Sequence, residues 1–271
     1  MTKQITNLHF SPTGNAKKIG AALAQAAAAV LQLPVTAYDI TLPQNRIALP
    51  VFTSEDLLII TMPVYAGRLP NKIAPDLIRL LKGDHTKAIA AVTYGNRHYD
   101  DALSEMKFIL ENAGFELVGA MAVPSEHAFS KSIATGRPDE TDLAAIADYM
   151  SALAEKLKTE LDLSPVNVPG NDPVGPYYTP LGTDGKPAKF LKAKPLTRPE
   201  LCTHCKLCAQ NCPMGSISKA DPADVTGICI KCQACVRHCP VQAKYFDDAA
   251  FQSHVQMLEG FAVGRKEIEY F

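Results

Sequence analysis

The sequence predicts an α/β protein in two parts: a doubly wound sheet of five parallel strands, then a small α+β domain built around cysteines. Short apolar runs alternate with helical stretches through the first 160 or so residues, a pattern typical of parallel sheets covered by helices. All eight cysteines lie between residues 202 and 239. A chain of 271 residues is long enough for two such domains.

Five strands and four helices are expected in the first part. The strands are residues 5–10, 35–40, 57–62, 87–93 and 115–123, and the helices are residues 16–31, 71–81, 100–113 and 139–161. The run 57–62 is nearly all apolar, as expected for a strand buried on both faces. Ligands of such sheets bind beyond the carboxyl ends of the strands, so the loops after the strands are the candidate site.

The loop after the first strand has the composition of an anion site. It supplies two hydroxyls, a glycine and the start of a helix, in the residues Ser11, Thr13, Gly14, Asn15 and Ala16. The first N–H groups of a helix have no intrahelical acceptor, and the helix dipole favours a negative charge there. The alternative is an ordinary N-terminal cap by Thr13 or Asn15, without a ligand.

The loops after the third and fourth strands carry tyrosines that could stack on a flat ring. The residues concerned are Pro63, Val64, Tyr65, Ala66 and Gly67 after the third strand, and Thr93, Tyr94, Gly95, Asn96 and Tyr99 around the end of the fourth. Tyr65 and Tyr99 are the best stacking candidates. The alternative for both is an ordinary half-buried loop tyrosine.

With these loops in place, residues 3–160 resemble a short-chain flavodoxin. The resemblance implies that Ser11, Thr13 and Gly14 belong to a phosphate loop and that the two tyrosine loops enclose the isoalloxazine ring of FMN. Ala16 stands where that family usually has another hydroxyl, and the chain has no tryptophan for the usual ring stack. Arg68, Arg97 and His98 follow the same strands, and a cation near the ring would stabilise reduced flavin.

The cysteines form one pattern written twice, C-x2-C-x2-C-x3-C-P. The first copy is Cys202, Cys205, Cys208 and Cys212 before Pro213, and the second is Cys229, Cys232, Cys235 and Cys239 before Pro240. This pattern is typical of [4Fe–4S] ligands. Structural zinc seldom uses three cysteines at successive spacings of three. A disulfide framework is disfavoured because the cysteines are close-set and the chain begins without an apolar signal core.

The cysteine segment resembles a bacterial two-cluster ferredoxin. In that family the fourth cysteine of each run binds the other cluster. The resemblance implies Cys202, Cys205, Cys208 and Cys239 for cluster 1, and Cys229, Cys232, Cys235 and Cys212 for cluster 2. Such a short segment has little core of its own, so the clusters would also hold its fold together.

Four segments are therefore expected. They are a flavodoxin-like FMN domain (1–162), a proline-rich linker packed on its surface (163–198), a two-cluster ferredoxin domain (199–248) and a tail that docks back on the body (249–271). Net charge is −1 and no apolar run approaches a membrane span, so neither nucleic acid nor membrane is expected as a partner. Thiolate ligands favour a reducing compartment, most simply the cytoplasm.

The whole chain resembles flavodoxin–ferredoxin fusions. The first functional hypothesis is an electron-transfer flavoprotein in which one cluster faces the FMN and the other faces a redox partner protein. The second is an FMN-dependent reductase of a small substrate, which needs an open pocket over the ring lined by Tyr65, Tyr99, His127 and Phe129. The third is a non-redox adaptor. The sequence indicates neither the partner, nor the direction of electron flow, nor the oligomeric state, and it shows no set of catalytic side chains.

Overall fold

The computed structural model describes residues 2–159, 163 and 166–271. The elements of the first part are β1 (Gln4–His9), α1 (Asn15–Leu31), β2 (Val35–Asp39), the 3-10 turn η1 (Pro43–Asn45), β3 (Asp56–Pro63), α2 (Ala74–Leu80), β4 (Thr86–Tyr94), α3 (Ala102–Asn112), β5 (Phe115–Pro124) and α4 (Glu140–Thr159). Each expected strand and helix is present, with ends that differ by up to three residues. The end of the last predicted helix, residues 160–161, lies outside the described residues.

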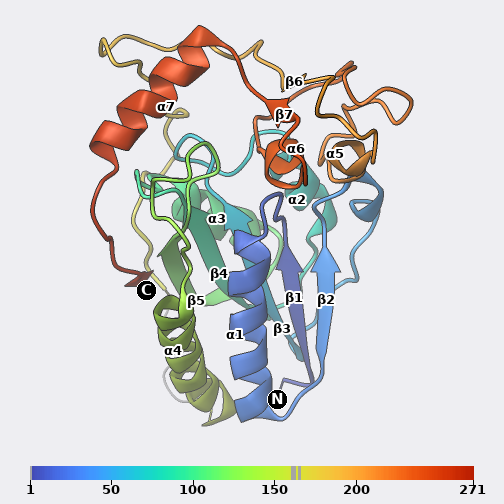
Figure 1. Cartoon of the computed structure of the whole chain (residues 1–271). Helices are drawn as coiled ribbons and strands as arrows, with labels where there is room; N and C mark the ends of the chain where they lie inside the picture. Colours follow the sequence, from blue (N-terminus) through green and yellow to red (C-terminus); the bar gives the residue numbers. More distant parts are fainter. Residues whose placement is uncertain (1, 160–162, 164–165) are drawn as a thin grey trace.

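These strands form one sheet in the order β2-β1-β3-β4-β5, and all four pairings among them are parallel. The predicted fold class, a doubly wound parallel sheet, is confirmed. The order reverses between β1 and β3, which is where such sheets bind ligands. Figure 1 shows α1 and α4 on one face of the sheet and α2 and α3 on the other.

Two hydrophobic cores flank the sheet because alternate strand residues point to opposite faces. Leu57 and Ile59 of β3 pack with α1 and α4, whereas Leu58 and Ile60 pack with α2 and α3. All four side chains have no exposed surface. This is why the run 57–62 is apolar throughout, and the strand is held on both sides at the point where its loop enters the candidate site.

The second part is small and mostly irregular. Its elements are β6 (Leu196–Thr197), α5 (Leu207–Gln210), α6 (Ala234–Arg237), β7 (Lys244–Tyr245), α7 (Ala249–Phe261) and β8 (Glu269–Tyr270). β6 and β7 pair antiparallel, and α5 and α6 lie above the carboxyl ends of β1 and β2 in Figure 1. No helix in the described part of the chain has the length and apolar character needed to cross a bilayer.

The last residues add a sixth strand that the sequence does not predict. β8 pairs antiparallel with β5, through Met121 with Tyr270 and Ala122 with Glu269. The Tyr149 hydroxyl of α4 also donates a hydrogen bond to the carbonyl of Phe271 (2.9 Å). A strand of two residues is too short to show an alternating sequence pattern, so it can be recognised only from its pairing with β5.

The proline-rich segment lies along the first part through hydrogen bonds to loop residues. Asp101, at the start of α3, accepts bonds from the N–H groups of Asn171 (2.9 Å) and Gly175 (2.7 Å), and these bonds lower the pKa of Asp101 against the opposing effect of its burial. The Tyr177 hydroxyl donates to the carbonyl of Leu69 (2.9 Å). These contacts bring Tyr177 and Tyr178 beside the carboxyl ends of the strands.

Candidate functional site

A cavity of about 540 Å³ lies beyond the carboxyl ends of the strands. Twelve of the fifteen predicted FMN residues line it: Ser11, Thr13, Asn15, Ala16, Pro63, Val64, Tyr65, Ala66, Gly67, Thr93, Tyr94 and Gly95. Gly14, Asn96 and Tyr99 do not. The structure thus brings the loop after β1 together with the loops after β3 and β4, as expected at the reversal of strand order.

The loop after β1 is held open for an anion by its own hydrogen bonds. Asp39 accepts the N–H of Thr41 (2.9 Å), the Thr41 hydroxyl oxygen accepts the N–H of Ser11 (2.8 Å), and the Ser11 hydroxyl oxygen accepts the N–H of Lys17 (2.9 Å). Within the described residues, the hydroxyl hydrogen of Ser11 has no acceptor, so it can donate to a ligand. Gly14 has φ of 96°, a left-handed conformation that a glycine adopts without strain. Phosphate fits this arrangement.

Asn96 and Tyr99 are positioned by the C-terminal segment instead of facing the cavity. The Asn96 side chain donates to the carbonyls of Ala262 (2.7 Å) and Gly264 (3.0 Å). Tyr99 is 2% exposed and its hydroxyl donates to Glu269 Oε2 (2.8 Å). Burial, and then this carboxylate, raise the pKa of Tyr99. The expectation that Tyr99 stacks on a bound ring is therefore corrected.

The arginine after β3 is likewise engaged elsewhere. Arg68 forms two hydrogen bonds with the carboxylate of Glu105, at 2.8 and 2.7 Å, and its guanidinium lies 4.9 Å from the ring centroid of Tyr177. Arg97 and His98 do line the cavity. Arg97 pairs with Asp100 and lies 4.1 Å from the ring centroid of Tyr178. Of these three residues, Arg97 and His98 therefore line the cavity and Arg68 does not.

One wall of the cavity consists of aromatic side chains. The sequence predicts two of them, His127 and Phe129, under the reductase hypothesis, and it does not predict Phe190 and His254. His127 and Phe129 from the loop after β5 meet Phe190 of the proline-rich segment and His254 of α7. His127 accepts the N–H of Phe129 at Nδ1 (3.0 Å). Burial, helped by neighbouring cations, lowers the pKa of His127 to about 4, so the ring is neutral at pH 7. Neither Phe190 nor His254 carries a local motif that marks it as a site residue.

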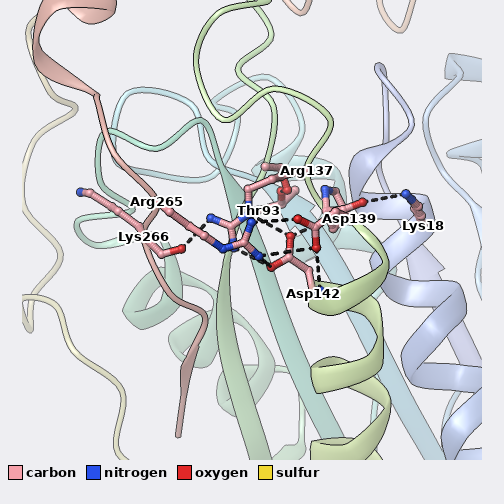
Figure 2. A network of polar contacts seen from close by, with 9 residues as sticks. Lys18, Thr93, Arg137, Asp139, Asp142, Arg265 and Lys266 are labelled. Carbon is pink, nitrogen blue, oxygen red and sulfur yellow. Dashed lines mark hydrogen bonds and ion pairs between the residues drawn. The ribbon is translucent and has the colours of Figure 1, made fainter.

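The loop after β5 is fixed by a charged network at the start of α4 (Figure 2). Arg137 bonds both oxygens of Asp142, at 2.8 and 2.6 Å, and donates to the carbonyl of Lys266 (2.5 Å). Arg265 bonds Asp139 (2.8 Å) and Asp142 (2.9 Å). The Arg265 contact is the main cause of the lowered pKa of Asp139. The network joins the C-terminal segment to the loop that carries His127.

The two cysteine copies have the same backbone. α5 and α6 start five residues after Cys202 and Cys229, and three matched pairs of residues are left-handed: His204 with Lys231, Lys206 with Gln233, and Gly215 with Gln242. Turns of this kind let successive thiols face one concavity. Backbone N–H groups also donate to sulfur, from Ser216 to Cys212 (3.3 Å), Lys231 to Cys229 (3.4 Å) and Ala243 to Cys239 (3.2 Å).

The eight thiols surround two separate hollows in two groups of four. One hollow is lined by Cys202, Cys205, Cys208 and Cys239, and the other by Cys212, Cys229, Cys232 and Cys235. Each group takes its fourth cysteine from the other copy, as the resemblance implies. In the described part of the chain, no three or more His, Cys, Asp or Glu side chains could hold one metal ion together. Cubane clusters fit this grouping, since each iron binds one thiolate.

The cysteine segment contacts the first part at the edge of the cavity. Cys229 and Cys232 line the cavity itself. Arg237 pairs with Glu126 (2.5 Å) and donates to the carbonyl of His127 (2.6 Å), and a His238 ring nitrogen lies 3.0 Å from the carbonyl oxygen of Pro12. The buried Arg46 donates to the carbonyl of Pro213 (2.7 Å). The group of thiols that contains Cys229 and Cys232 is thus fixed against the loops after β1 and β5.

Comparisons with known proteins found one family model and several solved structures that match parts of the chain. A family model described as a 4Fe-4S binding domain matches residues 196–218, which include the first cysteine copy. The comparison with curated proteins gave no match. Among solved structures, a flavodoxin from the domain Archaea is 14% identical with a TM-score of 0.41, and the match covers 58% of this chain and 99% of that chain.

Two further solved structures are similar at the same level. Oxidised flavodoxin 2 from Bacillus cereus is 15% identical (TM-score 0.42; 57% of this chain, 99% of that chain). Rubredoxin oxygen:oxidoreductase from Desulfovibrio gigas is 15% identical (TM-score 0.43; 59% of this chain, 37% of that chain). The strand order 2-1-3-4-5 is itself flavodoxin-like. The chain therefore joins a domain of flavodoxin-like topology to a segment that matches a 4Fe-4S binding domain.

Proposed function

We propose that this chain is an electron-transfer protein that carries one FMN and two [4Fe–4S] clusters. The observation that carries the proposal is the shared cavity, in which Cys229 and Cys232 face the same space as the loops after β1, β3 and β4. Bound FMN exchanges one or two electrons, whereas a cubane cluster passes them singly. A single chain fixes the distance between them, so the transfer does not depend on an encounter in solution.

The residues have separate tasks in this proposal. Ser11 and the first N–H groups of α1 would hold the phosphate, Gly14 would shape the loop that presents them, and Tyr65 would form a wall for the ring. Burial, with Cys232 as the next cause, raises the pKa of Tyr65, so this phenol stays protonated. Cysteines 212, 229, 232 and 235 would hold cluster 2, the cluster that faces the flavin. A reducing compartment such as the cytoplasm suits these thiolates.

The first experiment is an absorption spectrum of anaerobically purified protein with iron, sulfide and flavin counts on the same sample. About eight irons per chain are expected for two cubane clusters, together with about one FMN. Anaerobic titration with dithionite should then reduce both chromophores. Full iron content without flavin, and no rebinding of added FMN, would contradict the proposal and favour the cluster-bearing adaptor.

The aromatic wall supports a second candidate, an FMN-dependent reductase of a small molecule. Phe129, Phe190 and His254 extend the cavity beyond the flavodoxin-like loops, and its volume is typical of small-molecule sites. The test adds candidate acceptors, such as a soluble quinone, to the dithionite-reduced holoprotein. A reoxidation rate that saturates with acceptor concentration and falls in the Phe190→Ala variant would favour the reductase. Reoxidation that stays first order in acceptor would favour electron transfer alone.

A further inference from the structure

Two loops beside cluster 2 form an exposed surface at the rim of the FMN cavity, whose lining also includes Leu191 and Ile228. We call it the lysine patch and define it as Lys189, Leu191, Lys192, Lys194 and Ile228. It surrounds an open hollow of about 380 Å³ lined by residues 191–194 and 226–229. The loops are tied together, because Lys194 Nζ donates to the carbonyl of Val225 (2.6 Å) and Lys231 Nζ to that of Leu191. The patch is therefore one surface.

Two apolar side chains stand at the centre of the patch without cover. Leu191 is 90% exposed and Ile228 is 56% exposed. Exposed apolar side chains are common singly, but here two flank one hollow. A centre that is apolar and a rim that is charged is the usual anatomy of a protein–protein interface.

The rim of the patch carries a single sign of charge. Residues 186–194 contain four lysines and no acid, and residues 225–232 contain one lysine and no acid. Within the described residues, Lys189 and Lys192 have exposed side chains that make no ion pair. The whole chain has a net charge of −1, so this positive charge is a local concentration. Such a patch attracts acidic partners and raises their association rate.

The patch also lies next to the redox groups of the proposal. Leu191, Ile228 and Cys229 line both the open hollow and the FMN cavity. A protein seated on the patch would therefore approach cluster 2 directly. The sequence-based hypothesis instead had the donor meet the cluster that does not face the flavin.

We propose that the lysine patch is the docking surface of a small electron-carrier protein with an acidic face around its redox centre. The inference rests on the proposed electron-transfer function and adds the partner class and its place of contact. A protein is favoured over a small anion because an anion would gain nothing from exposed Leu191 and Ile228.

The test uses the oxidised and the reduced holoprotein with a small acidic bacterial-type ferredoxin as the probe. Binding of the oxidised ferredoxin is measured by calorimetry, and electron delivery from the reduced ferredoxin by stopped flow. Between about 0.01 and 1 M salt the Debye length falls from about 30 to 3 Å. The delivery rate should therefore fall by about tenfold or more. A rate that is independent of salt would overturn the proposal.

Matched variants locate the surface. Lys189→Glu with Lys192→Glu should weaken binding and slow delivery by about tenfold at low salt and have little effect at high salt. The control is Lys82→Glu with Lys156→Glu, which makes the same charge change at exposed sites near the amino ends of the strands. Leu191→Ser should weaken binding at every salt concentration. Equal effects of the two double variants would overturn the proposal.

Reduction by dithionite separates this inference from the proposed function. Dithionite needs no docking surface, so the double variant Lys189→Glu with Lys192→Glu should be reduced by it at the wild-type rate. A holoprotein that dithionite reduces normally but that shows no specific ferredoxin binding would contradict the lysine patch alone. A protein without flavin would contradict the proposed function itself.

Discussion

At the scale of single residues, substitutions in the two groups of thiols are expected to have different effects on flavin reduction. Cys232 lines the FMN cavity, whereas Cys205 lines only the hollow of the other group. Cys232→Ser should lower the iron content from about eight to about four per chain and slow flavin reduction by ferredoxin. Iron analysis and stopped-flow absorbance of the flavin measure both effects.

Cys205→Ser is the matched control for that change. It removes one ligand of the distant cluster and should lose a similar amount of iron, but it keeps cluster 2 between the lysine patch and the flavin. Flavin reduction should then stay closer to the wild-type rate. Equal rates in the two variants would show that the group around Cys232 has no special place in the path.

Gly14 gives a second residue-scale prediction. With φ of 96°, an alanine here is strained by about 1–2 kcal/mol, although a Cβ would meet no atom within 4 Å. Relief of that strain would move the phosphate loop, so Gly14→Ala should weaken FMN binding. Flavin fluorescence titration measures the dissociation constant.

Gly185 serves as the control for Gly14. It also has positive φ (73°) and open space, but it lies in the proline-rich segment, away from the loop after β1. Gly185→Ala should lower stability to a similar extent and leave FMN affinity unchanged. A loss of affinity in both variants would mean that general strain, and not the phosphate loop, is responsible.

At the scale of elements, the strength of the local pattern decides what the sequence predicts. The apolar run of β3 and the loop after β1 carry their own signals, and both were expected where the structure has them. β8 has only two residues and exists through its pairing with β5. The hydrogen-bond partners of Tyr99 and Asn96, Glu269 and Ala262, lie about 170 residues away in the chain. The local sequence does not reveal these partners, so it assigns both residues to the flavin site.

The charged network at the start of α4 allows a prediction about stability at the scale of elements. Arg137 and Asp142 are 4% and 3% exposed at their side chains, so loss of Arg137 leaves the buried carboxylate of Asp142 with only its half-exposed partner Arg265. Arg137→Met should cost about 3–5 kcal/mol of unfolding free energy. Arg265→Met removes a half-exposed partner of the same carboxylate and should have little effect. Urea unfolding compares the two, and similar losses would contradict the burial argument.

At the scale of the whole molecule, the two parts depend on different forces. The flavodoxin-like domain has two large hydrophobic cores. The small core of the cysteine segment consists of Cys208, Ala209, Ile217 and Cys235, so half of its buried members are themselves thiols. A segment with so little apolar burial depends on its metal for stability. The fold of the second part and its contacts with the cavity should therefore depend on iron, whereas the fold of the first part should not.

Anaerobic removal of iron with a chelator tests this division. The chelated protein should become sensitive to protease within residues 199–248 while circular dichroism still shows the sheet and helices of the first part. Burial raises the pKa of Cys235 to about 12 and that of Cys232 further, so these two thiols stay protonated at neutral pH when they are folded without iron. Iron binding must release these protons, and unfolded thiols titrate near pH 8.5. Reconstitution with iron and sulfide should therefore become more complete as the pH rises from about 7 to 8.5. Loss of the whole fold on chelation would show instead that the first part depends on the clusters as well.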